Sequence, residues 1–300
     1  MSESKVASTC NDQGFVFATT GPEYTILAQR AARTLRLHMP DANVDLFTDQ
    51  QVEDTVFNKV FKLERSWFRP KIEAMRKTRF ERTVILDADI IVLMDVSELF
   101  DVLHDFDLAA AGALNRGPVV TKTNPPIPRS FPFLNSGVLG IRKSAKMEAF
   151  SEEWERRLDE TQAPYDQIIL RQMLYEDMAK FCVYPQEYNI FDVAAFDRWR
   201  PIHGAPRILH LTELHKRPPG SPLDPFDLRA EIGQIRGDHV SKLIQFDEHI
   251  GQGKTFQSGV LYINSEEELE LTQKRLRTFR KNKNQGKKWR GGQMHEPGRD

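Results

Sequence analysis

The sequence has few of the features that mark secreted, membrane-spanning or fibrous proteins. Only two of its 300 residues are cysteine, Cys10 and Cys182, which excludes a disulfide framework and a four-cysteine zinc site. No apolar run approaches the roughly 18 residues of a transmembrane helix. The 17 glycines and 17 prolines follow no period, which excludes a collagen-like chain. The N-terminus lacks the basic start and apolar run of a signal peptide. We therefore expect a globular, cytoplasmic protein.

The near-neutral net charge of −1 conceals an uneven distribution of charge. Nine lysines and arginines and no acidic residue lie between Leu271 and Gly291, so the rest of the chain carries −10. An acidic body argues against a broad nucleic-acid surface. The basic tail, with Trp289 among its cations, predicts peripheral contact with the anionic inner face of a membrane. The alternative is a solvated, disordered terminus.

Short apolar segments alternate with amphipathic ones from Gly14 onward. Strands are predicted at 15–19, 44–48, 56–63, 83–92, 108–112, 133–141 and 208–211, and helices at 22–38, 71–80, after Ser144 and at 166–175. The run at 83–92 is apolar on both faces, which is typical of a central strand of a parallel sheet. The order of elements predicts an α/β fold with a mainly parallel central sheet and flanking helices.

Two aspartates, Asp87 and Asp89, follow the most apolar segment, Val84-Ile-Leu86. Carboxylates at the end of a buried strand are costly unless a positive partner holds them, and two such groups can converge on a divalent cation. In open α/β sheets, ligands bind at the carboxyl ends of strands. The alternative is an aspartate that caps the next element. Asp105-Phe-Asp107 has the same spacing but no long apolar strand before it, so we do not interpret it as a metal site.

The order of further polar segments resembles that of a known enzyme family. These segments are Ala18-Thr-Thr-Gly-Pro-Glu-Tyr24, Lys71, Leu134-Asn-Ser-Gly-Val138, Asp166-Gln167, Tyr184-Pro-Gln-Glu-Tyr-Asn189, and His210 with Lys216. Together with Asp87-Ala-Asp89 they resemble the GT-A nucleotide-sugar glycosyltransferases over roughly residues 15–218. The closest resemblance is to family 8, which includes glycogenin and bacterial lipopolysaccharide galactosyltransferases. It implies a GT-A (Rossmann-like) fold and a hexosyltransferase that uses a nucleoside diphosphate sugar, with UDP as the nucleotide, and retains configuration.

The resemblance also implies a metal site formed by Asp87, Asp89 and His210. A diphosphate leaving group calls for a cation, and this donor set suits Mn²⁺ or Mg²⁺ better than zinc. His203 and His215 are alternative ligands. The family's closing segment, His-x-x-Gly-x-x-Lys-Pro-Trp, is altered in this chain: Glu replaces the Gly, and Arg-Pro follows the Lys.

Other roles in the site follow from the resemblance as well. Donor and nucleotide contacts are implied for Ala18, Thr19, Tyr24, Lys71, Asp87, Ala88, Ser136 and Lys216, and catalytic roles for Asn135, Asp166 and Gln167. By themselves, the lysines could be solvated surface groups and Tyr24 an ordinary core ring. Asp166 could cap a helix, and Gly137 could mark a bulge or the close approach of a ligand.

We divide the chain into a flexible N-terminus (1–13), a GT-A catalytic domain (14–219), a helical C-terminal appendage (220–270) and a basic, disordered tail (271–300). The expected partners are a nucleotide-sugar donor and a saccharide, lipid-linked or protein acceptor. Two alternatives stay open: a catalytically silent sugar-nucleotide-binding protein of the same fold, and a haloacid-dehalogenase-type phosphatase. Ile91 argues against the phosphatase, because it stands where that class has Thr or Val after its D-x-D pair.

Overall fold

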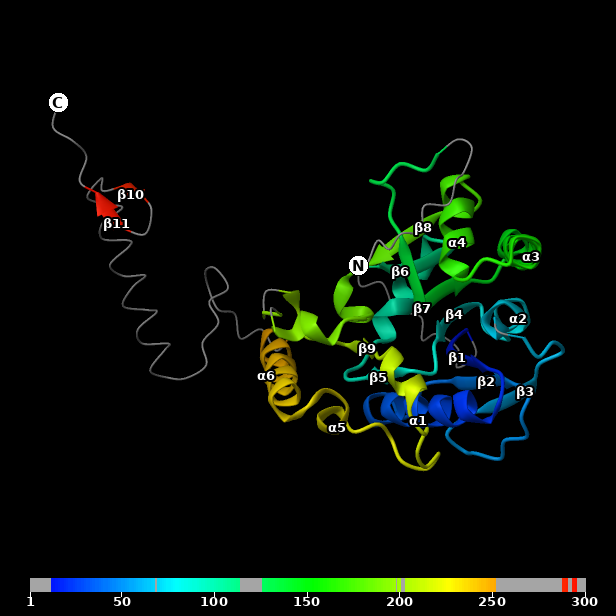
Figure 1. The fold of residues 1–300 in the computed structure, drawn as a ribbon, viewed down its shortest axis with the longest axis horizontal. Coiled ribbons are helices and arrows are strands. Elements are labelled where there is room, and N and C mark those ends of the chain that lie inside the picture. Colours follow the sequence, from blue (N-terminus) through cyan, green and yellow to red (C-terminus); the bar gives the residue numbers. More distant parts are fainter. Residues whose placement is uncertain are drawn as a thin grey trace, which may run out of the picture.

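A computed structural model of the protein describes residues 12–67, 69–113, 126–197, 199–200, 203–251, 288–290 and 293–295. The N-terminal segment, Cys10, most of the proline-rich loop before Pro132 and most of the basic tail lie outside these residues. Figure 1 shows a sheet with helices on both faces, and α5 and α6 extend away from it. No helix among the described residues is long and apolar enough to cross a membrane.

The central sheet of the described chain has seven strands. In spatial order they are β3 (Lys59–Lys62), β2 (Val44–Thr48), β1 (Gln13–Thr19), β4 (Arg82–Leu86), β7 (Leu134–Arg142), β6 (Leu108–Gly112) and β8 (Phe181–Tyr184). All neighbours pair in parallel except β7, which is antiparallel to both β4 and β6. The predicted α/β class with a mainly parallel sheet is therefore confirmed.

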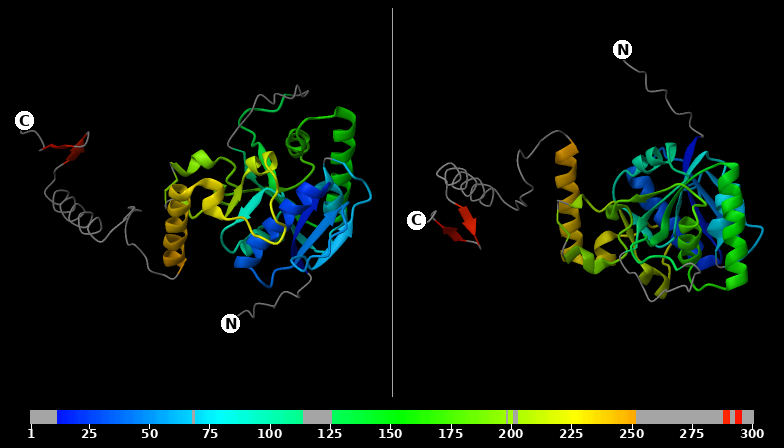
Figure 2. Two further views of the ribbon diagram at one scale, coloured as in Figure 1. Left: turned by 60° about the horizontal axis from the view of Figure 1, so that its bottom comes forward. Right: turned by 90° about the horizontal axis from the view of Figure 1, so that it is seen from above.

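Alternating side chains of the central strands divide the hydrophobic core into two layers. In β1, Phe15 and Phe17 belong to one layer, whereas Val16 belongs to the other. This alternation follows from the two-residue period of a strand. The first layer is covered by α1 (Pro22–His38) and the 3₁₀ helix η1 (Ser97–His104), and the second by α2 (Pro70–Lys77), α3 (Ala145–Thr161) and α4 (Asp166–Tyr175). The views in Figure 2 show helices on both faces of the sheet.

The predicted single strand at 83–92 is wrong. The structure contains two strands there, β4 and β5 (Ile90–Val92), with a turn at residues 87–89 between them. β5 leaves the central sheet and pairs antiparallel with β9 (Ile208–His210). The predicted strand at 56–63 is shorter in the structure, because only β3 pairs with β2. Both errors arise because an apolar run does not show which neighbour each residue will find.

The remaining elements connect these layers. The helix predicted after Ser144 is confirmed as α3, and the Ser144 hydroxyl accepts a hydrogen bond from the Met147 N–H at 3.2 Å. Short 3₁₀ helices follow β8 and β9, and two α-helices and a small hairpin come after them. They are η2 (Gln186–Tyr188), η3 (Val193–Asp197), η5 (Thr212–Lys216), α5 (Leu228–Ile232), α6 (Gln234–Gly251), β10 (Lys288–Arg290) and β11 (Gln293–His295).

Candidate functional site

The turn between β4 and β5 is fixed by backbone hydrogen bonds on both sides. The Asp87 N–H donates to the Gly137 carbonyl of β7 at 2.9 Å, and the Leu211 N–H donates to the Asp89 carbonyl at 2.8 Å. In the β5–β9 pair, His210 lies opposite Ile90, the residue after Asp89. The departure of β5 from the sheet therefore brings the histidine to the carboxylates.

Asp87, Asp89 and His210 form a cluster with the donor set of a metal site. One potential ligand atom from each lies within 4.8 Å of those of the other two. His210 Nε2 is 3.3 Å from Asp89 Oδ1 and 3.8 Å from Asp87 Oδ2. Asp89 and His210 are buried, and the Asp87 side chain is 29% exposed, which leaves an approach from solvent. Two carboxylates and an imidazole can together hold a divalent cation.

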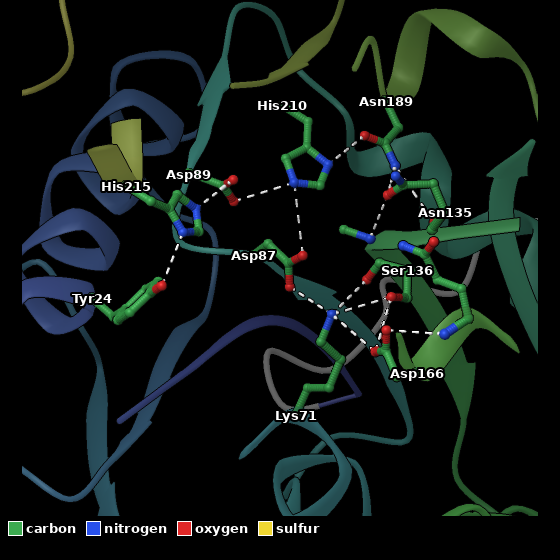
Figure 3. A network of polar contacts seen from close by, with 12 residues as sticks. Tyr24, Lys71, Asp87, Asp89, Asn135, Ser136, Asp166, Asn189, His210 and His215 are labelled. Atoms are coloured by element: carbon green, nitrogen blue, oxygen red, sulfur yellow. Dashed lines mark hydrogen bonds and ion pairs between the residues drawn. The ribbon is translucent and has the colours of Figure 1, made fainter. Parts of the chain in front are cut away.

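A chain of two asparagines orients His210 (Figure 3). His210 Nδ1 lies 3.1 Å from Asn189 Oδ1, and Asn189 Nδ2 donates to Asn135 Oδ1 at 2.9 Å. Because Asn189 presents its oxygen, His210 donates through Nδ1–H, and Nε2 is the ring nitrogen that faces the carboxylates. Asn135 thus acts on the histidine in this structure. No role was predicted for Asn189, although its position at the end of the Tyr184–Asn189 segment was a signal.

Gly137 is required by the same histidine. A Cβ atom at this position would lie 2.3 Å from ring atoms of His210. The glycine therefore allows the imidazole to pack directly against β7, so the predicted close approach involves a side chain of the protein itself.

Lys71 occupies the centre of the polar network in Figure 3. Its Nζ lies 2.7 Å from Asp87 Oδ1 and 3.7 Å from Asp166 Oδ2. It also donates to the Ser136 carbonyl at 3.1 Å, and the Ser136 hydroxyl donates to Asp166 Oδ2 at 3.1 Å. The Lys71 side chain is only 12% exposed, so a solvated surface lysine is excluded. The cation links a candidate metal ligand to the first residue of α4.

Contacts within the cluster oppose the effect of burial on the pKa values of Lys71, His210 and Asp89. Burial by itself lowers the pKa of Lys71, but Asp87 and Asp166 outweigh burial and raise this pKa. Burial likewise opposes the charged form of His210, whereas Asp89 and Asp87 raise its pKa. Burial would raise the pKa of Asp89, but His210 and His215 hold it below its usual range. Polar and charged partners thus outweigh burial at all three of these groups.

Asp166 begins α4 and is not the N-cap residue, because Tyr165 occupies that position. The Asp166 side chain is buried, and the Trp154 indole N–H donates to its carbonyl at 3.2 Å. Gln167 follows it and is partly buried. The structure therefore holds the Asp166 carboxylate at the edge of the cluster of Asp87, Asp89 and His210.

Tyr24 is joined to the cluster through a histidine of η5. The Tyr24 side chain is exposed, and its hydroxyl lies 3.1 Å from His215 Nδ1. His215 Nε2 lies 2.6 Å from Asp89 Oδ2. The core alternative for Tyr24 is excluded by its 44% exposure. Ala18, Thr19 and Ala88 lie at the ends of β1 and β4, beside the same edge of the sheet.

Lys216 differs from the other predicted cations, because the structure does not bring it to the network. It is two-thirds exposed and forms an ion pair with Glu213 at 2.6 Å. Lys216 and Glu213 also line a pocket of about 540 Å³. Phe191 lines this pocket and packs edge-to-face on His210, with ring centroids 5.2 Å apart. The pocket and the cluster therefore share Phe191 as a neighbour.

Comparison with known proteins identifies a family and a fold. The family model for nucleotide-diphospho-sugar transferases matches residues 28–217. A search among curated proteins found no match. Among solved structures, the galactosyltransferase LgtC in complex with donor and acceptor sugar analogues is similar to this chain at 15% identity and a TM-score of 0.52, over 80% of this chain and 99% of LgtC. The glycosyltransferase GlyE of Streptococcus pneumoniae is similar at 19% identity and a TM-score of 0.53, over 84% of this chain and 67% of GlyE.

The match covers more than half of the chain, including β4, the turn at 87–89, α4 and His210. It favours the transferase over the phosphatase alternative. The chain belongs to the nucleotide-diphospho-sugar transferase family and is a glycosyltransferase of the GT-A fold, similar to family 8.

Proposed function

We propose that this glycosyltransferase uses a UDP-sugar and a divalent cation, Mn²⁺ or Mg²⁺, and that the cluster of Asp87, Asp89 and His210 is its metal site. The observation that supports the proposal most strongly is the convergence of these three groups, with Lys71 beside them, at the carboxyl end of a central strand. When bound there, the cation would neutralise the diphosphate leaving group. Carboxylates directed at a dianion would otherwise repel it.

The protein's own residues would bind the donor around this site. Tyr24 would offer its exposed ring to the uracil, and Lys71 would contact the phosphates or the donor sugar. Ser136 and Asn135 face the same network from β7. These contacts would hold the anomeric carbon over Asp166 and Gln167.

In the reaction, the bond from the anomeric carbon to the diphosphate oxygen breaks, a bond to an acceptor hydroxyl oxygen forms, and the hydroxyl proton is released. Gln167 is a poor nucleophile because an amide has no accessible anion. Asp166, held by Ser136 and Trp154, would orient sugar hydroxyls or stabilise positive charge at the anomeric carbon. We propose a retaining outcome, and we place the acceptor in the pocket beside Phe191 and Lys216.

The direct test is a panel of nucleotide sugars incubated with the protein and Mn²⁺, with release of the nucleoside diphosphate as the readout. We expect hydrolysis of a UDP-sugar that stops when a chelator is added. Hydrolysis at the same rate in chelator would contradict the metal assignment.

The silent sugar-nucleotide-binding protein is the second candidate, and one observation favours it. Lys216 pairs with Glu213, the residue that replaces the glycine of the family's closing segment. Metal-dependent binding of UDP without turnover of any donor in the panel would support this candidate over the enzyme.

We propose further that the protein is cytoplasmic and that its basic tail contacts an anionic membrane surface. Nine cations without an acidic residue between Leu271 and Gly291 carry this proposal. Each cation near such a surface contributes about 1 kcal/mol. The full-length protein should sediment with anionic liposomes at low salt and leave them at high salt. Failure to sediment at low salt would contradict membrane contact.

A further inference from the structure

Asp89 lies between two histidines, and each contacts a different carboxylate oxygen. His210 Nε2 is 3.3 Å from Oδ1, whereas His215 Nε2 is 2.6 Å from Oδ2. Figure 3 shows the two rings on opposite sides of the carboxylate. Asp89 is 2% exposed, so its oxygens depend on protein groups for their hydrogen bonds. The Oδ2 oxygen is therefore bonded to His215, and Oδ1 faces His210, the other buried candidate ligand.

His215 is not part of the group of ligands itself. Among the described residues, only Asp87, Asp89 and His210 offer ligand atoms that all lie within 4.8 Å of one another. The second ring nitrogen of His215 faces the Tyr24 hydroxyl at 3.1 Å, and the two rings meet edge-to-face. A neutral imidazole donates with one nitrogen and accepts with the other. Since the Asp89 carboxylate accepts from Nε2–H, Nδ1 accepts from the Tyr24 O–H.

The position of His215 is held by the fold on both sides. Leu214 is buried beside it, and β9 precedes η5 in the chain. After η5, the chain crosses α1, where Arg30 donates to the Pro219 carbonyl at 2.7 Å and Arg33 to the Pro222 carbonyl at 2.9 Å. Tyr24 belongs to the first turn of the same helix. One helix therefore anchors both the tyrosine and the segment that follows the histidine.

We propose that His215 is a positioning residue that fixes Asp89 for the metal and links the metal site to Tyr24. By donating to Oδ2, it leaves Asp89 to ligate through Oδ1. By accepting from Tyr24, it ties the orientation of this nucleotide-facing ring to the same carboxylate. Groups that hydrogen-bond to a metal ligand typically change metal affinity 10- to 100-fold. The inference rests on the metal-dependent function proposed above and assigns a role that the neighbouring Lys216 does not share.

The test measures Mn²⁺ binding in the absence of nucleotide, by the electron paramagnetic resonance signal of free Mn²⁺. We expect His215→Ala to weaken Mn²⁺ binding about 10- to 100-fold. His215→Gln, whose amide can still donate to Asp89, should bind within about threefold of wild type. Tyr24→Phe removes the neutral hydrogen bond between Tyr24 and His215. It should weaken Mn²⁺ binding about two- to tenfold.

A matched control is His203→Ala, which removes a histidine outside this cluster. His203 Nδ1 accepts from the Arg200 N–H at 3.0 Å, and its ring packs on Trp199. We expect this variant to bind Mn²⁺ as the wild type does. Electron spin-echo modulation of bound Mn²⁺ should show one histidine nitrogen, which belongs to His210, both in the wild type and in His215→Ala.

The outcomes separate this inference from the proposed function. If the wild type does not bind Mn²⁺, the proposed metal-dependent function fails. If the wild type binds and His215→Ala binds equally well, the function stands and the inference is overturned. Two histidine nitrogens on Mn²⁺ in the wild type would make His215 a ligand and would also overturn it. Should His215→Ala fail to fold, Tyr24→Phe and the wild-type spin-echo spectrum still decide.

Discussion

The chain contains two Asp-x-Asp segments that differ in what surrounds them. Asp89 follows the central strand β4, and its neighbours are two histidines. Asp107 precedes β6, and its carboxylate contacts two permanent cations, Arg142 at 2.7 Å and Lys146 at 3.0 Å. Both aspartates are buried. A carboxylate already neutralised by fixed cations is a structural group, whereas one beside histidines and a second carboxylate can still take a metal.

The largest expected effect on ligand binding is at the first segment, Asp87-Ala-Asp89. Asp89→Asn should lower the Mn²⁺-dependent affinity for UDP by about 100-fold or more, because it removes a charged ligand. Mn²⁺ should raise the melting temperature of the wild type, as any ligand bound only by the folded state does, and this rise should disappear in the variant. Calorimetry and thermal unfolding with and without Mn²⁺ measure both effects. If Asp89→Asn responds to Mn²⁺ as the wild type does, Asp89 is not a metal ligand, and the two Asp-x-Asp segments do not differ in this way.

The next largest effect is expected at Lys71, the cation that pairs with Asp87. Lys71→Met removes the ammonium between Asp87 and Asp166 and should lower UDP-sugar hydrolysis about 10- to 100-fold. Its affinity for Mn²⁺ should not fall, since the lysine competes with the metal for Asp87. Hydrolysis rates together with Mn²⁺ titration test this. A parallel loss of Mn²⁺ affinity would show that Lys71 mainly shapes the metal site.

At the second segment the expected effect is on stability. Asp107→Asn should lower the free energy of unfolding by roughly 2–3 kcal/mol, because charge-assisted hydrogen bonds are lost and two cations are left without their carboxylate. Mn²⁺ and UDP affinities should equal those of the wild type. Urea unfolding and calorimetry distinguish the two segments. Lost UDP affinity in a folded Asp107→Asn protein would contradict the structural assignment.

The pH dependence of this stability follows from the same contacts. Burial alone would raise the pKa of Asp107, but hydrogen bonds from Arg142, Lys146 and the Lys180 N–H lower it to about 2. The folded state therefore gains stability above the unfolded pKa of about 3.9 and loses it as the pH falls toward 2. The stability difference between wild type and Asp107→Asn should be constant at pH 6–8 and shrink below about pH 4. A difference that grows in acid would contradict this sign.

The smallest expected effect is at Lys216. Lys216→Ala should weaken UDP binding by on the order of 1.5 kcal/mol, about tenfold, if this exposed cation turns from Glu213 to the diphosphate. Mn²⁺ affinity without nucleotide should not change. Isothermal titration with UDP and Mn²⁺ tests both statements. Unchanged affinity for UDP would remove Lys216 from the donor site.

Much of this organisation could be predicted from the sequence, because periodicity and strand ends carry the information. Helix 22–38 and helix 166–175 were predicted with the bounds that α1 and α4 have. Asp87 lies at the carboxyl end of β4, where ligands of open α/β sheets bind, and Lys71 at the start of α2 and His210 at the end of β9 meet it there.

Other features depend on tertiary pairing that no local pattern shows. The break between β4 and β5 arises because residues 90–92 find a partner in β9. The orientation of η5, which turns His215 inward and leaves Lys216 in solvent, follows from where the chain is anchored on α1. Asn189 could not be assigned to His210 before the fold placed the two side chains together.

The most direct test of the central claim is calorimetric titration of the wild-type protein with UDP, first with Mn²⁺ and then with a chelator. If Asp87, Asp89 and His210 form the metal site of a donor pocket, UDP should bind with Mn²⁺ and lose most of its affinity in the chelator. Equal affinity for UDP in both solutions would contradict the account.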